Sequence, residues 1–304
     1  MENKKNIMID ITSFIALQKS FLQDCTTRNP KTLCTYRVAL QSFQKFLQSN
    51  NLNVINIASL NKFRDYLLQT KKLKENTVHT YFTGLSRFFH YLIKRRIINY
   101  NPVKDIKYKI TKKNSKIRFF THNQIDKIIS GIDDTTIHGL RDIALIHIIT
   151  QTGLKESKVI NLKIKHLIHY GKYWYLQFHE ANNSKYNTKI RLSNSLIAAL
   201  ETYFKQRGVS LKHKEEHLFI SNSNRSKNQQ ISERSIREIV KRRIQNSSLK
   251  KKHKNKLTPV TLRNTGIINV IARINSRDQI KEFFGIKLDS TLDRYLELAK
   301  AISK

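Results

Sequence analysis

The sequence predicts a mainly α-helical protein of two domains, with a small β-hairpin in the C-terminal domain. The 304 residues include only 8 Gly and 3 Pro, and so few helix breakers favour helices. Apolar residues recur at helical spacing in both halves of the chain. A basic, weakly periodic stretch lies between the halves, so we expect domains at 1–100 and 119–304 and a linker at 101–118.

The apolar spacing predicts four amphipathic helices in the first domain. We place them from Asp10 to Gln23, from Leu33 to Leu47, from a cap at Ser59 to Leu67, and from Asn76 or Thr77 to Leu92. Aromatic residues at this spacing indicate a packed core rather than platforms on which bases stack. The first domain is therefore expected to be compact and all-α.

The second domain is predicted to combine helices with one hairpin. Thr121 to Gln124 has the form of a capping box, and a strongly apolar helix is expected from Arg141 to about Thr150. Tyr173 to Phe178 and Thr188 to Leu192 have strand composition, and the turn-like Ala181 to Ser184 lies between them.

A later helix is predicted to begin at a Ser232 cap and to be basic on one side. Its basic face consists of Arg234, Arg237, Lys241 and Arg242. We interpret this face as a candidate for contact with the major groove of DNA.

The chain is strongly basic, with 57 Lys and Arg against 22 Asp and Glu and a formal net charge of +35. The composition bias of an AT-rich genome would raise the Lys count, but it does not explain the scarcity of acidic residues. A charge this large repels itself in the folded state unless a polyanion neutralises it. We therefore expect a nucleic-acid partner, with an anionic membrane surface as the alternative.

Other classes of protein are disfavoured by the composition. Cys25 and Cys34 are the only cysteines and lack metal-ligand spacing, and the 11 His show no zinc pattern, so we expect neither a metal nor a cofactor. We find no signal-peptide pattern and no run of about twenty apolar residues. A cytoplasmic protein that is not attached to a membrane is expected.

Two stretches near the C-terminus carry the chemistry. Thr258 to Thr265 reads as a Pro-led helix start that presents Arg263, and Gly285 to Tyr295 reads as a loop and a helix that present Tyr295. A tyrosine phenolate can attack a DNA phosphorus, and an arginine can hold the non-bridging oxygens bidentately. The pair predicts attack on a DNA phosphate.

These stretches resemble the tyrosine recombinase family, which includes phage integrases and Xer-like proteins. The family signature is His-x-x-Arg, then Leu-Gly-His, then a tyrosine. Arg263 falls on the arginine, Tyr295 on the nucleophile and Phe284-Gly285-Ile286 on Leu-Gly-His, without gaps in the spacing. Val260 and Ile286 replace the two histidines.

The resemblance extends to further site residues. Thr152 to Leu162 is similar to a family segment whose first catalytic arginine falls on Lys155 and whose usual glutamate falls on Lys158. The family hairpin carries a lysine that protonates the leaving 5′ oxygen, which implies Lys185 as the best match and Lys189 as the second choice.

The N-terminal half resembles the helical core-binding domain of the same family. Lys31 to Arg37 and Asn76 to Tyr81 are similar to its DNA-facing helices, whose N-termini would contact phosphates. The implied DNA contacts are Thr32, Tyr36, Arg37, Asn76 and Thr77, although ordinary helix capping by Thr and Asn explains the same residues. In the family, the linker lets the two domains close on DNA as a clamp.

The resemblance implies a site-specific recombinase that breaks and rejoins DNA through a 3′-phosphotyrosyl intermediate. It implies a double-stranded recombination site and a homo-tetramer on DNA as partners. Four residues are conceivable replacements for the missing histidines: Asn264, Thr261, His253 and Lys287. Two alternatives remain, a catalytically weak or inactive DNA-binding relative with an accessory or regulatory role, and a general basic helical nucleic-acid binder that does not cut DNA.

Overall fold

The structure is a computed structural model that describes residues 9–26, 29–107, 116–177, 189–222, 227–254, 257–271, 273–274 and 276–302, without the side chains of 252 and 253. The chain divides into two compact units, unit 1 from Met1 to Asn114 and unit 2 from Ser115 to Lys304. Both are mainly helical, with small antiparallel sheets, which confirms the predicted fold class.

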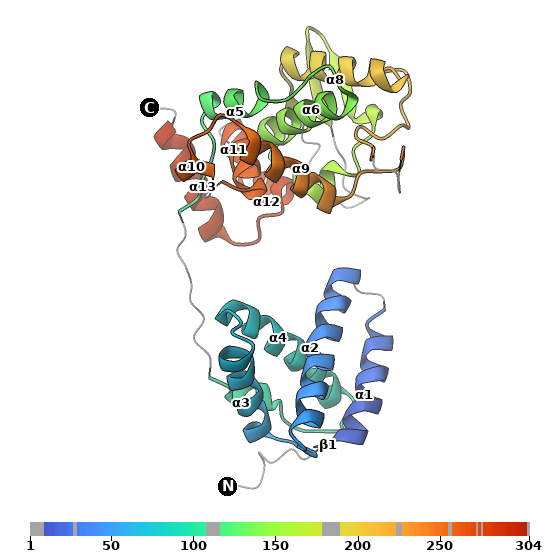
Figure 1. Cartoon of the computed structure of the whole chain (residues 1–304), viewed down its shortest axis with the longest axis vertical. Coiled ribbons are helices and arrows are strands. Elements are labelled where there is room, and N and C mark those ends of the chain that lie inside the picture. Colours follow the sequence, from blue (N-terminus) through green and yellow to red (C-terminus); the bar gives the residue numbers. More distant parts are fainter. Residues whose placement is uncertain are drawn as a thin grey trace. The chain divides into compact units, whose positions relative to one another are not determined.

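The described part of unit 1 is a set of helices with one short two-stranded ladder (Figure 1). Its elements are β1 (Ile9–Asp10), α1 (Ile11–Asp24), α2 (Pro30–Ser49), β2 (Val54–Ile55), α3 (Ile57–Asp65), a π-helical turn (Tyr66–Thr70), α4 (Glu75–Lys94) and a 3-10 turn (Pro102–Asp105). Ile9 pairs with Ile55 in the antiparallel ladder, which the sequence did not predict.

Aromatic side chains fill the core of unit 1. The Phe14 ring lies edge-on to Phe43 at 5.7 Å and to Phe88 at 5.2 Å between centroids, so α1, α2 and α4 meet at these rings. Phe63 of α3 packs against Phe43 at 4.9 Å. The interpretation of the spaced aromatics as core residues is confirmed.

Three predicted helix starts in unit 1 were wrong. Helix α2 begins at Pro30, three residues before the predicted Leu33, and Asn29 caps it. Asn56, not Ser59, caps α3: its side chain accepts from the Ser59 backbone N–H at 2.8 Å, while Ser59 Oγ accepts from the Asn56 backbone N–H at 2.9 Å. Ser59 is thus the third residue of a capping box rather than the cap. Helix α4 begins at Glu75, one residue before the earlier of the two predicted starts, and Lys74 caps it without a side-chain hydrogen bond.

The described part of unit 2 surrounds one apolar core (Figure 1). Its elements are α5 (His122–Ile129), α6 (Ile137–Thr152), α7 (Glu156–Val159), a 3-10 turn (Ile164–His166), β3 (Leu167–Tyr170), β4 (Tyr173–Gln177), β5 (Lys189–Arg191), α8 (Asn194–Arg207), α9 (Glu233–Asn246), α10 (Lys251–Lys254), α11 (Pro259–Ile271), α12 (Arg277–Phe284) and α13 (Asp289–Ile302). Thr121 forms the predicted capping box with Gln124, and Ser232 caps α9 by accepting from Ser235 N–H.

The sheet of unit 2 has three described strands in the order β3-β4-β5, all antiparallel. Leu176 of β4 is opposite Leu167 of β3 and Ile190 of β5, so these side chains share one face. The predicted hairpin corresponds to β4 and β5, and β3 is an additional strand. The predicted turn at Ala181 to Ser184 lies outside the described residues.

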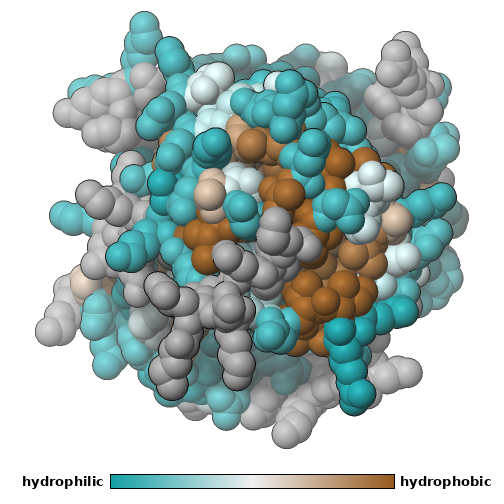
Figure 2. All heavy atoms as spheres, turned by 90° about the horizontal axis from the view of Figure 1, so that it is seen from below, coloured by the Kyte–Doolittle hydropathy of each residue, from teal (hydrophilic) through white to brown (hydrophobic). Residues whose placement is uncertain are grey.

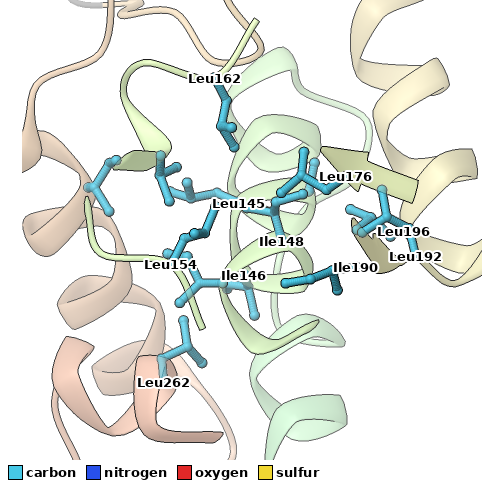
Figure 3. Packing of buried hydrophobic residues seen from close by; sticks show 14 of the residues in the cluster. Leu145, Ile146, Ile148, Leu154, Leu162, Leu176, Ile190, Leu192, Leu196 and Leu262 are labelled. Carbon is cyan, nitrogen blue, oxygen red and sulfur yellow. The ribbon is translucent and has the colours of Figure 1, made fainter. Parts of the chain in front are cut away.

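Helix α6 runs through the centre of this core. Figure 3 shows its residues Leu145, Ile146 and Ile148 between Leu262 of α11 on one side and Leu176 and Ile190 of the sheet on the other. Such packing fixes the position of α11 relative to α6.

Two glycines, Gly153 and Gly266, make a close contact between the end of α6 and α11. A Cβ added to Gly266 of α11 would lie 2.3 Å from the backbone N of Gly153 and 2.3 Å from the carbonyl oxygen of Ile149. Gly153 ends α6 in the left-handed conformation, with φ of 64°. Only residues without a side chain fit here, and the contact brings the first turns of α11 beside the end of α6.

The surface of the molecule is uneven in hydropathy. On the face in Figure 2, hydrophilic residues surround an area in which hydrophobic residues gather. Within the described segments, we find no helix with the length and apolar character needed to cross a membrane.

Candidate active site and nucleic-acid interface

The packing of α13 on α11 brings Tyr295 to Asn264. The Tyr295 hydroxyl donates a hydrogen bond to Asn264 Oδ1 at 2.6 Å, and both residues are 8% exposed. Asn264 Nδ2 donates to the carbonyl oxygen of Arg118 at 2.9 Å. Of the four conceivable histidine replacements, Asn264 is therefore the one whose contact with the tyrosine is described.

Arg263, next to Asn264 on α11, is held by two main-chain carbonyls. Its Nε donates to Gly153 O at 3.1 Å, and its Nη2 donates to Phe284 O at 2.7 Å. The guanidinium thus joins the ends of α6 and α12, which fixes its plane. In the described part of the chain, no hydrogen bond of Nη1 is found.

The two groups influence each other electrostatically. Burial raises the pKa of the Tyr295 phenol above its ordinary value, while the charges of Arg263 and Arg294 act to lower it. Burial lowers the pKa of the Arg263 guanidinium, and Tyr295 and Glu156 oppose this change. Because arginine titrates so far above neutral pH, Arg263 stays charged, whereas Tyr295 is a neutral phenol at neutral pH.

Two lysines converge on the turn after α12. A Cβ placed on Gly285 would lie 3.0 Å from Lys155 Nζ, so the Lys155 ammonium sits beside this glycine. Lys158 Nζ donates to Phe283 O at 2.6 Å. Arg263 therefore contacts Phe284, and Lys155 lies beside Gly285, the next residue. Lys158 contacts Phe283, the residue before Phe284.

The residues at the two histidine positions take no polar part. Val260 is 59% exposed in the first turn of α11, and Ile286 is buried in the apolar core. Of the other conceivable replacements, Thr261 is buried and accepts from the Thr258 backbone N–H at 3.1 Å, which stabilises the start of α11 in the way that Ser59 stabilises α3. Lys287 is exposed, and the His253 side chain lies outside the described residues.

Lys185, the predicted general acid, also lies outside the described residues. Its alternative Lys189 is on β5, with Nζ 5.9 Å from the centroid of the Tyr170 ring. Within the described residues, no group of three or more His, Cys, Asp or Glu side chains gathers in a geometry that would hold a metal ion.

Most of the predicted DNA contacts of unit 1 are at its surface. Arg37, Asn76 and Thr77 are exposed, and Thr32 is half-buried. Tyr36 is the exception, because it is 8% exposed and its ring lies 5.8 Å from that of Phe21 in the core. Tyr36 packs α2 against α1, and we remove it from the set of candidate DNA contacts.

The predicted basic face of α9 divides into two parts. Arg234, Arg237 and Lys241 are exposed, on the side away from the buried Ile236 and Val240.

Arg242 is drawn into an ion cluster instead. Its Nη2 lies 3.3 Å from the fully buried Asp142 of α6, which also binds Arg243 and Arg141, each at 2.8 Å. The cluster ties α9 to α6, so Arg242 has a structural partner that the sequence did not reveal.

Comparison with known proteins assigns the family. Residues 118–301 match the Phage integrase family, and residues 13–110 match the Phage integrase SAM-like domain. The chain belongs to the phage integrase family.

Curated relatives are tyrosine recombinases. XerC of Bacillus subtilis is 23% identical over 167 residues, which cover 54% of this chain and 52% of XerC. XerC of Oceanobacillus iheyensis is 24% identical over 235 residues, which cover 75% of this chain and 74% of that protein. The chain spans about half the length of several of these relatives, including XerC of Lactobacillus delbrueckii.

Solved structures share the fold. The XerH site-specific recombinase bound to difH substrate in a pre-cleavage complex gives a TM-score of 0.68 at 17% identity and covers 99% of both chains. A lambda integrase dimer bound to a COC′ core site gives a TM-score of 0.64 at 15% identity, over 95% of this chain and 77% of that chain.

Proposed function

We propose that this protein is a site-specific DNA recombinase that breaks and rejoins DNA through a 3′-phosphotyrosyl intermediate. The observation that carries the proposal is that the nucleophile Tyr295 of α13 is hydrogen-bonded to Asn264 of α11, the residue next to the cation Arg263. Tyr295 lies within the electrostatic reach of Arg263, whose plane is fixed by two carbonyls. A net charge of +35 supports DNA as the substrate.

In the proposed cleavage step, Tyr295 Oη attacks a DNA phosphorus. The bond between phosphorus and Oη forms as the bond between phosphorus and the 5′ oxygen breaks. The phenol loses its proton, and the leaving 5′ oxygen gains one. Rejoining reverses these events, when a 5′ hydroxyl attacks the phosphotyrosine and releases the phenol. One phosphoester replaces another in each step, so no external energy source is required.

The other residues are proposed to stabilise charge and move the proton. Arg263 would bind the non-bridging oxygens through its remaining N–H groups, and Lys155 would add a second positive charge from the turn at Gly285. Lys185 is the proposed acid for the 5′ oxygen. The position of Lys189 against the Tyr170 ring favours Lys185 over it.

We propose that residues 1–100 and 119–304 grip the duplex as a clamp around the linker at 101–118. The exposed Arg37, Asn76 and Thr77 in the first domain, with Thr32, and Arg234, Arg237 and Lys241 in the second supply the phosphate contacts. Recombination between two duplexes requires several strand cuts. Each cut uses one tyrosine as the nucleophile. A homo-tetramer on DNA provides one Tyr295 for each of the exchanged strands.

A second function, DNA binding with weak or no cleavage, is favoured by one observation. The core position of Ile286 removes a polar group from the site, and loss of one oxyanion donor typically costs about 10²–10³ in rate. A recombinase fold with this deficit would still bind DNA through its basic surfaces.

Covalent capture separates the two functions. Nicked suicide duplexes tiled from the DNA that flanks the gene are incubated with the protein, and adducts are detected on denaturing gels. Tyr295→Phe should abolish adducts and leave DNA binding intact, because only the attacking oxygen is lost. Tyr170→Phe, at an exposed strand residue, is the matched control. Failure of the wild type to form adducts on duplexes that it binds would support the binding-only function.

A further inference from the structure

We propose that Asn264 is a positioning residue that holds the Tyr295 hydroxyl and couples it to the backbone segment at the start of unit 2. The inference rests on the proposed function and specifies how the nucleophile of that site is controlled. It requires a side chain that contacts both Tyr295 and the backbone segment at the start of unit 2. Asn264 has both contacts, at 2.6 Å and 2.9 Å.

The orientation of the Asn264 amide is fixed by its partners. The Arg118 carbonyl can only accept a hydrogen bond, so the amide nitrogen must face it. The amide oxygen therefore faces Tyr295, and the phenol must donate its proton toward Oδ1. A phenolate has no proton to donate and would face the oxygen lone pairs. This arrangement stabilises the neutral phenol and holds Tyr295 in a resting state.

The segment that fixes the amide follows directly from the stretch between the two units. Arg118 is tied to α11 by Asn264, and the Phe120 backbone N–H donates to Thr265 Oγ1 at 2.8 Å. Two consecutive residues of α11 therefore dock the segment from Arg118 to Phe120. If this segment lifts from α11, the Asn264 amide can rotate and donate Nδ2 to a phenolate. Displacement of residues 118–120 from α11 would thus release the nucleophile.

The charged groups that act on Tyr295 are Arg263 from α11 and Arg294 from α13. Both positive charges stabilise the phenolate. They therefore act against the hydrogen bond to Asn264, which stabilises the neutral phenol. Asn264→Ala removes the acceptor of the phenol proton and leaves a small cavity beside the hydroxyl. The midpoint of Tyr295 ionisation should therefore move to lower pH.

The test measures ionisation and cleavage on the same variants. The ultraviolet absorbance of tyrosinate is followed against pH, and subtraction of the matching Tyr295→Phe protein isolates Tyr295 from the other tyrosines. Asn269→Ala is the control, because Asn269 is on the same helix and also donates from Nδ2 to a carbonyl, Thr150 O at 3.1 Å. Asn264→Ala should lower the midpoint and Asn269→Ala should not. Equal midpoints of Tyr295 ionisation in Asn264→Ala and Asn269→Ala would contradict the proposed role of Asn264.

Cleavage on the nicked duplexes adds a second readout. In Asn264→Ala the maximal rate of adduct formation should fall by up to about a hundredfold, because the nucleophile is no longer positioned. The alkaline rise of the rate should move to lower pH, a change that a purely structural role would not produce. Thr265→Val should shift the ionisation midpoint in the same direction, and no shift would overturn the coupling to the segment. Absence of adducts in the wild type would refute the recombinase function. The absorbance titration would still show whether Asn264 stabilises the neutral phenol of Tyr295.

Discussion

Arg263 Nη2 donates to the carbonyl oxygen of Phe284 at 2.7 Å, at the C-terminal end of α12. The last carbonyls of a helix carry partial negative charge, so a cation is stable there. The same guanidinium is attached to the end of α6 through Gly153 O. One arginine therefore connects two helix ends, next to the residue that accepts from Tyr295.

Arg263→Lys should reduce adduct formation by about 10²–10³ while DNA binding changes little. A lysine keeps the charge, but it cannot hold two carbonyls and also present a planar fork to a phosphate. Rates are measured in single turnover on the nicked duplexes. Arg273→Lys, at an exposed residue just beyond α11, is the control and should behave like the wild type. Equal rates for the two variants would exclude Arg263 from the site.

Lys155→Arg should raise the rate of adduct formation by about tenfold, because one charge-assisted hydrogen bond contributes ~1.5 kcal/mol. Gly285, which lies beside the Lys155 ammonium, has no side chain to obstruct the larger head group. Lys158→Arg is the matched control, since Lys158 is engaged with Phe283 O. A lower rate in Lys155→Arg would mean that the site is adapted to lysine, contrary to this expectation.

Gly266→Ala should lower the free energy of unfolding by about 1–3 kcal/mol, because the new methyl group would press on the backbone at Gly153 and Ile149. Urea unfolding measures the effect. Gly131→Ala should be close to neutral, since the nearest atoms to its added Cβ are 3.8 Å away. Adduct formation should also fall in Gly266→Ala, because Gly153 O anchors Arg263. A stability equal to that of Gly131→Ala would contradict the close approach of the two helices.

Replacement of Arg234, Arg237 or Lys241 by Ala should weaken DNA binding and reduce the slope of log K against log salt by about 0.9 for each phosphate that the variant no longer binds. Fluorescence anisotropy over a salt series gives the slope. Lys205→Ala removes the same charge from the exposed side of α8 and serves as the control. Arg242→Ala should change stability more than the salt slope, because Arg242 is paired with the buried Asp142. Identical slopes for the α9 variants and Lys205→Ala would remove α9 from the DNA interface.

Local signals in the sequence predicted most of the long helices and some of their caps, but α6 begins at Ile137 rather than Arg141, and α12 was not predicted. The Thr121 box and the Ser232 cap depend on residues only three positions apart, and the structure has both. The start of α3 was misplaced because Asn56 and Ser59 are both good capping residues, and only the backbone decides between them. Strand β3 was missed because Leu167 to Tyr170 is short, and its pairing with β4 is what stabilises it.

The site could be predicted only in part, because its contacts are not local. The order of Arg263 and Tyr295 identified the pair, but the Asn264 bond joins residues on different helices and the Arg118 bond joins α11 to the start of the unit. Tyr36 was misassigned because the spacing that fits a DNA-facing motif also fits the apolar face of α2. The Asp142 cluster likewise required the packing of α9 on α6.

The two carbonyl anchors of Arg263 have an evolutionary consequence. A lineage that stopped cutting DNA would still need this arginine to align α6 and α12, so selection for folding alone would retain it. The Tyr295 hydroxyl is different, because a phenylalanine ring would fill the same space and only Asn264 would lose a partner. Among descendants of this chain, drift from Tyr to Phe at 295 with Arg263 unchanged would mark the point at which cleavage ceased to matter.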